Sequence, residues 1–86
     1  MSMMVAPITI QEIDENGDAL EWVAEKPHDL LNIAEELLTE FDQPQTLQKF
    51  KLMMATYHRV GSVACVVWLI KELNALGFYK YKAVFQ

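Results

Sequence analysis

An acidic segment near the start of the chain has a spacing that partly matches a calcium-binding loop. Its first, third and fifth positions are Asp14, Asn16 and Asp18, and its twelfth is Glu25. Such a loop binds Ca²⁺ through side-chain oxygens and needs glycine at its sixth position, where this chain has Ala19. A calcium loop also joins two helices, whereas the residues on both sides alternate as strands do. We therefore interpret the segment as an acidic hairpin turn.

Two histidines and one cysteine are the other residues whose side chains commonly bind metals or act as nucleophiles. His28 and His58 lie 30 residues apart, and neither has a cysteine or a second histidine near it in sequence. A protein metal site usually needs three or four ligands. Cys65 lies inside an apolar run, which favours a core role over the accessible, acidified thiol that catalysis requires. We predict no catalytic residue, metal or cofactor.

Two alternating segments predict a β-hairpin around this turn. Ile8 and Ile10 alternate with polar residues in the first, and Leu20 and Trp22 alternate with glutamates in the second. Asn16-Gly17 between them favours a type I′ turn, in which both central residues have positive φ. We expect the four apolar side chains to face the core. Because Ile13 falls out of phase, the pattern indicates either a bulge or a sheet that is partly covered on both faces.

Residues 28–41 have the spacing of an amphipathic helix. Asp29 is a plausible N-cap, and Asp42-Gln43-Pro44 ends the pattern. The side chains predicted to face the core are Leu30, Ala34, Leu37, Leu38 and Phe41.

A second helical pattern extends from Thr46 to Leu76. One unbroken helix of this length would measure about 46 Å at the standard rise, and a domain of this size is roughly 31 Å across. We therefore predict a break at residues 58–62, with Ser62 as a new N-cap. The run from Val63 to Ile70 has no polar side chain, so we expect this helix to be covered on every side.

Gly77 is a suitable C-cap, and the residues after it predict a C-terminal strand. Its apolar face comprises Tyr79, Tyr81, Ala83 and Phe85, with Lys80 and Lys82 on the other face. The predicted fold is α+β: an N-terminal β-hairpin, two or three helices and a C-terminal strand, with the helices packed on one face of a small antiparallel sheet. We expect one domain spanning residues 1–86, with residues 1–4 flexible.

Composition bounds the class of protein. The chain has 86 residues, is 52% hydrophobic and carries a net charge of −5. This excludes a disordered tail and disfavours nucleic acid as the main partner. One cysteine suits a reducing compartment, and no apolar run approaches the roughly 20 residues that span a bilayer. We therefore expect a cytoplasmic protein that does not enter a membrane.

The charges are divided unevenly along the chain. Residues 1–43 hold 11 acids and one lysine, whereas residues 44–86 hold six bases and one acid. One interpretation is that the two halves fold together with opposite charges facing each other, including Lys80 and Lys82 against glutamates of the hairpin. The other is a polarised surface whose acidic face meets a basic partner.

These observations favour a non-enzymatic protein that acts through protein–protein contacts. It would be an adaptor, inhibitor or accessory subunit, of the kind found in phages and mobile elements, and we expect a homodimer. An adaptable, partly apolar stretch is the predicted contact surface for the partner protein, and it comprises Met53, Tyr57, His58 and Arg59.

Two alternatives stay open. The first is a small-molecule site or weak enzyme between sheet and helices, formed by Tyr79, Tyr81, Trp22 and His58. The second is a nucleic-acid-binding surface on the basic second half, or an acidic face that mimics nucleic acid.

Overall fold

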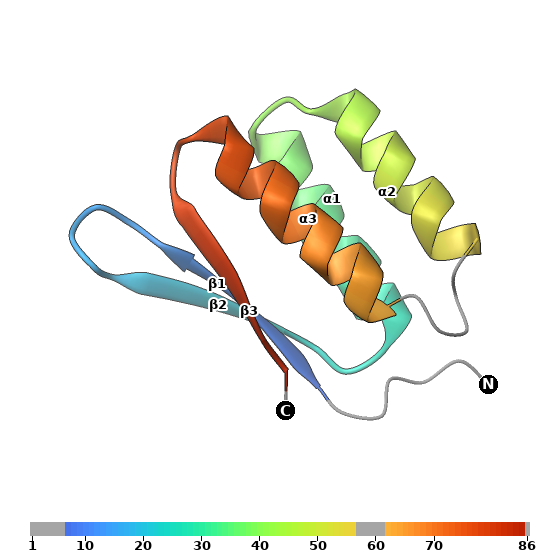
Figure 1. The fold of residues 1–86 in the computed structure, drawn as a ribbon, viewed down its shortest axis with the longest axis horizontal. Helices are drawn as coiled ribbons and strands as arrows, with labels where there is room; N and C mark the ends of the chain where they lie inside the picture. Colours follow the sequence, from blue (N-terminus) through green and yellow to red (C-terminus); the bar gives the residue numbers. More distant parts are fainter. Residues whose placement is uncertain (1–6, 57–61, 86) are drawn as a thin grey trace.

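The structure is a computed structural model that describes residues 7–56 and 62–85 (Figure 1). The elements follow in the order β1 (Ile8–Ile13), β2 (Ala19–Ala24), α1 (Pro27–Glu40), α2 (Pro44–Thr56), α3 (Ser62–Leu76) and β3 (Lys80–Phe85). The predicted α+β class, hairpin, helices and C-terminal strand are confirmed. The expected flexibility of residues 1–4 concerns positions outside the described residues.

The three strands form one antiparallel sheet in the order β2-β1-β3. Ile10 of the central strand is opposite Trp22 on one side and Ala83 on the other. The register of both pairs is regular from Ile8 to Ile13, so no bulge is present in β1. Ile13 instead lies half-buried on the sheet face turned away from the helices. This agrees with the second predicted arrangement, a sheet that is partly covered on both faces.

The helices cover one face of this sheet. α1 packs beside β2 and α3 beside β3, while α2 contacts both of these helices and lies on their far side from the sheet (Figure 1). α2 and α3 are two separate helices that pack against each other, so the predicted helix break is confirmed. Residues 57–61, which include most of the predicted break, lie outside the described residues.

Two prolines and an aspartate explain where α1 and α2 begin. α1 and α2 begin at Pro27 and Pro44, and proline suits the first helical position because its missing N–H has no partner there anyway. Asp29 was predicted to be the N-cap of α1, but the N-cap is Lys26 and Asp29 is the third residue of the helix. Its carboxylate accepts hydrogen bonds from the backbone N–H groups of Glu25 (3.0 Å) and Lys26 (3.3 Å).

One hydrophobic core lies between the sheet and the helices. Leu30, Leu37 and Leu38 of α1 are fully buried, as their spacing predicted, and so is Phe50 of α2. The ring of Phe50 stacks on Trp68 of α3 with centroids 6.4 Å apart. This contact joins α2 and α3, the two helices on either side of the predicted break.

Two expectations about side chains and one about the hairpin turn are wrong. Leu20 lies on the helix-facing side of the sheet, opposite Glu12 near the start of β2, but is 60% exposed. α3 is not covered on every side, since Val63 and Val67 are 55% and 56% exposed. The turn is not type I′, because Asn16 does not have positive φ whereas Gly17 does (86°).

The predicted pairing of lysines with hairpin glutamates is also wrong. β3 is next to β1 and not β2, so Lys82 is opposite Gln11, which itself donates a hydrogen bond of 2.6 Å to Glu21. Within residues 7–56 and 62–85, the single ion pair joins Lys51 of α2 to Glu35 of α1 at 3.4 Å. Both of its side chains are exposed, so it stabilises the fold by at most about 1 kcal/mol.

Candidate functional site

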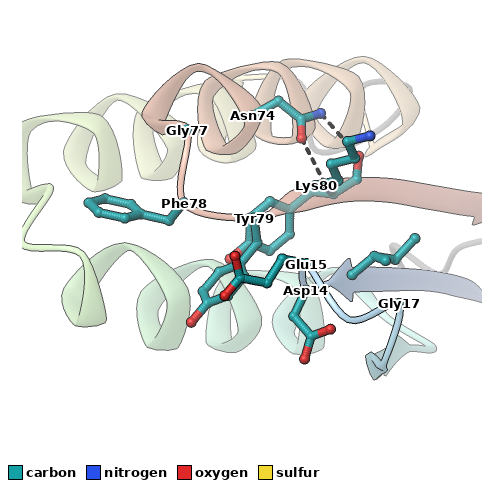
Figure 2. A pocket seen from close by; sticks show the side chains of 10 residues that line it. Asp14, Glu15, Gly17, Asn74, Gly77, Phe78, Tyr79 and Lys80 are labelled. Atoms are coloured by element: carbon teal, nitrogen blue, oxygen red, sulfur yellow. Dashed lines mark hydrogen bonds between the residues drawn. The ribbon is translucent and has the colours of Figure 1, made fainter.

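An open depression of about 900 Å³ lies at the end of the sheet where two turns meet. One side is the β1–β2 turn, and the other is the connection from α3 to β3 (Figure 2). The side chains that matter for its chemistry are Asp14, Glu15, Phe78, Tyr79 and Lys80. Four of these five are charged or carry a hydroxyl, and two are aromatic.

The hairpin turn is held by the carboxylate of Asp14. Its Oδ1 accepts hydrogen bonds from the backbone N–H groups of Asn16 and Asp18, each 2.9 Å long. The backbone carbonyl of Asp14 also accepts from Gly17 N–H (3.0 Å), and Gly17 takes the left-handed conformation that closes the turn. Asp14 is therefore partly engaged within the turn, whereas Glu15 beside it is exposed.

Asn74 holds the opposite side of the depression in place. Its side chain donates to the backbone carbonyl of Tyr81 (3.0 Å) and accepts from the Tyr81 backbone N–H (2.7 Å), as the dashed lines in Figure 2 mark. Gly77 ends α3 with φ of 81° and donates to the Asn74 carbonyl at 3.1 Å. Together these contacts fix how the chain leaves the helix and enters β3.

The two aromatic residues in this connection are unusually open to solvent. Phe78 is 64% exposed and Tyr79 is 40% exposed. Phe78 stacks on Phe41, the C-cap of α1, with centroids 5.1 Å apart and rings 5° from parallel, and Tyr79 is 6.3 Å from the same ring. Phe41 thus contacts both of these rings, which are among the residues that line the depression.

A buried polar pair adjoins the depression, and Tyr81 is the member of the pair that helps to line it. Tyr81 is 4% exposed, and its hydroxyl donates a short hydrogen bond of 2.5 Å to Glu12, which is 9% exposed. Burial, this bond to Glu12 and the charges of Glu12 and Glu40 raise the pKa of Tyr81 well above its usual value of 10. The phenol therefore stays protonated and remains a donor, so we assign the pair a structural role.

The chemistry of the open site favours a cation. Carboxylates attract positive charge directly, and aromatic ring faces attract it through their quadrupoles. Glu15, Tyr79 and Phe78 offer both kinds of group to the same depression. Lys80 is the one base among the described residues that line it, and it extends from the open face of the sheet at the rim.

The residues predicted from sequence have different outcomes. Met53 is half-buried and lines a shallow groove of about 550 Å³ between α2 and α3, whereas Tyr57, His58 and Arg59 lie outside the described residues. Of the residues predicted for a small-molecule pocket, Tyr79 and Tyr81 do line one depression. Trp22 does not line it; its indole N–H donates to Glu36 at 2.6 Å. His58 is outside the described part of the chain.

The sequence interpretation missed Glu12, Asn74 and Phe78. The alternation that begins at Ile8 assigns Glu12 to the helix-facing side of β1, so the burial of Glu12 could have been predicted from the sequence. The role of Asn74 depends on how α3 lies on β3, which no local pattern reveals.

The described residues include no helix that is both long enough and apolar enough to cross a bilayer. Within 7–56 and 62–85, no three His, Cys, Asp or Glu residues are grouped closely enough to hold a metal ion. We also compared the chain with protein-family models, with curated proteins and with solved structures. None of the three comparisons finds a significant match, so function must be inferred from the residues of this chain itself.

Proposed function

We propose that this chain is a non-enzymatic protein-binding module of the cytoplasm, acting as an adaptor, inhibitor or accessory subunit. Its primary contact is the depression at the hairpin end of the sheet, which receives a lysine or arginine side chain of a partner protein. The observation that carries this proposal is the exposure of Phe78 and Tyr79 beside the carboxylates of Asp14 and Glu15.

A protein partner fits this surface better than a small molecule does. Small-molecule sites bury most of their ligand, whereas this depression is wide and open. Exposed aromatic side chains on rigid supports are typical of the residues that dominate protein–protein binding energy. Phe41 supplies that support here by stacking under Phe78.

Charge supports a basic partner over nucleic acid. The acids around the depression would repel a phosphate backbone, since binding of DNA or RNA requires a basic surface. The same acids would attract a segment that carries lysine or arginine, and the acidic first half of the chain would extend this attraction over a distance.

The test begins with a library of random 12-residue peptides selected against the immobilised full-length chain. We expect the recovered peptides to contain lysine or arginine and to weaken by about 5- to 30-fold on Tyr79→Ala. That range corresponds to about 1–2 kcal/mol, the size of a cation–π contact plus its ring burial. Leu52→Ala is the matched control, because Leu52 is 68% exposed on α2, away from the depression, and should leave affinity unchanged.

Two further measurements separate the alternatives. Glu15→Gln should reduce both the affinity and its dependence on salt, because it removes an exposed carboxylate without changing side-chain size. Peptides that lack basic residues, or that shift backbone amide signals around Met53 rather than around Tyr79, would refute the depression as the primary contact. The second outcome would support the surface that includes Met53.

A further inference from the structure

The outer edge of β3 has backbone groups that face away from the sheet. Asn74 bonds both the N–H and the carbonyl of Tyr81, so these groups point away from β1. Backbone groups in an antiparallel strand alternate in direction, so those of Ala83 and Phe85 point the same way as those of Tyr81. Among the described residues, no partner bonds these outward groups of Ala83 and Phe85.

Apolar side chains flank this open edge. Asn74 reaches the edge from α3, and Val67 and Val63 lie seven and eleven residues before it, on the same side of the helix. Both valines are more than half exposed, and at the end of β3 Val84 is 39% and Phe85 45% exposed. An open strand edge beside an exposed apolar helix face is the arrangement to which an additional strand binds.

We infer that a second copy of this chain covers this edge, through antiparallel pairing of β3 with the partner's β3. The two three-stranded sheets then form one continuous sheet of six strands, with the two copies of α3 adjacent through Val63 and Val67. The edge lies at the far end of β3 from the depression described above, so this inference does not depend on the proposed function.

Asn74 selects the register of this pairing. It occupies the edge groups of Tyr81, so only Ala83 and Phe85 remain available on each copy. A two-fold arrangement that bonds both of these residues on each copy must pair Ala83 with the partner's Phe85, and the axis then passes through Val84. Each such pair exchanges two hydrogen bonds, so the dimer gains four.

The side chains on the open sheet face also suit this register. Val84 meets the partner's Val84 and extends the cross-strand row of Val23, Thr9 and Val84. Lys82 and the partner's Lys82 are offset by four residues along the strands, about 13 Å, which exceeds the screening length of about 8 Å at physiological salt. The pairing therefore keeps the two Lys82 side chains apart.

The other edge of the sheet does not suit a second copy. The outward backbone groups of β2 belong to Ala19, Glu21 and Val23, by the same alternation from the hairpin turn. Self-pairing of β2 would bring Glu21 close to the partner's Glu21 on the same face, and like charges opposite each other are destabilising. Charge thus distinguishes the two edges.

Cross-linking of the full-length protein tests the register directly. In the inferred dimer the Cα atoms of Val84 and the partner's Val84 are about 4.5 Å apart, within disulfide range. Val84→Cys should therefore form a covalent dimer on mild oxidation, whereas Lys82→Cys should not. The native Cys65 is fully buried and does not compete. Equal cross-linking of the two variants would overturn the inference.

Sedimentation velocity between 5 and 200 µM tests the edge itself. We expect twice the monomer mass of 9.9 kDa. Ala83→Pro removes an outward N–H and should weaken dimerisation at least tenfold, while Ala19→Pro, the same change on the β2 edge, should not. Val67→Lys should also weaken dimerisation at least tenfold. It leaves the backbone of β3 unchanged, so it serves as the test if Ala83→Pro does not fold. A wild-type monomer at 200 µM would overturn the inference.

Discussion

The hydrogen bond between Tyr81 and Glu12 gives the sharpest test of how the sheet is stabilised. It joins residues 69 positions apart, and both side chains are buried. Tyr81→Phe keeps the ring and its packing but leaves the Glu12 carboxylate without its phenol donor. The substitution thus isolates one hydrogen bond to a charged group inside the core.

The expected cost follows from the kind of bond that is lost. A hydrogen bond to a charged group contributes about 1.5–3 kcal/mol, and Glu12 at 9% exposure has little water to replace the phenol. We therefore expect Tyr81→Phe to lower the free energy of unfolding by about 2 kcal/mol. For a domain of this size, that corresponds to a fall in Tm of about 8–16 °C.

Urea unfolding followed by circular dichroism measures this change, with Tyr79→Phe as the matched control. Tyr79 is exposed and its hydroxyl has no hydrogen-bond partner among the described residues, so its loss should change stability by less than about 0.5 kcal/mol. Adding Glu12→Gln alone and with Tyr81→Phe completes a double-mutant cycle, in which we expect about 1–2 kcal/mol of coupling. Equal stability of the two tyrosine variants would refute the reasoning.

Three further predictions follow from the described geometry. Tyr81 keeps its proton in the folded state above pH 10, whereas the same tyrosine ionises in the unfolded chain. Its contribution to the free energy of unfolding should therefore be constant below pH 10 and fall by about 1.4 kcal/mol per pH unit above it. Urea unfolding between pH 9 and 11.5 measures this slope, and the contribution should be absent in Tyr81→Phe. Gly77→Ala should cost about 1 kcal/mol by thermal unfolding, all of it from the backbone, because nothing lies within 4 Å of the added Cβ while φ is 81°. Burial raises the pKa of Cys65, so its thiol should react with Ellman's reagent at least about a hundredfold more slowly in the folded protein than in urea.

Local patterns were sufficient to predict the elements of this fold. The alternation around Ile10 and Trp22 predicted a hairpin, and the period-3.6 spacing around Leu37 predicted α1. The helix break was predicted by comparing the length of one straight helix with the size of the domain. Each of these arguments uses only neighbours in sequence or the overall dimensions of the chain.

The candidate site could not be predicted in the same way. Its two sides are the β1–β2 turn and the connection after α3, about 60 residues apart, and they meet only because β3 pairs with β1. Local sequence patterns do not choose between pairing β3 with β1 and pairing it with β2. That choice also decides that Lys82 lies opposite Gln11 and away from Glu21. Glu12 is on β1 beside β3, but its side chain is on the helix-facing side with Tyr81, whereas Lys80 and Lys82 are on the open face, so it does not pair with them either.

The position of β3 beside β1 has a consequence for synthesis on the ribosome. Ile13 ends β1, whereas Lys80 begins β3 67 residues later, an interval of about 3–13 s at typical elongation rates. During that time the nascent chain holds at most a two-stranded hairpin, which is marginally stable in water. One side of β1 stays unpaired until β3 emerges, so this interval is when the growing chain is most open to aggregation or to capture by a chaperone.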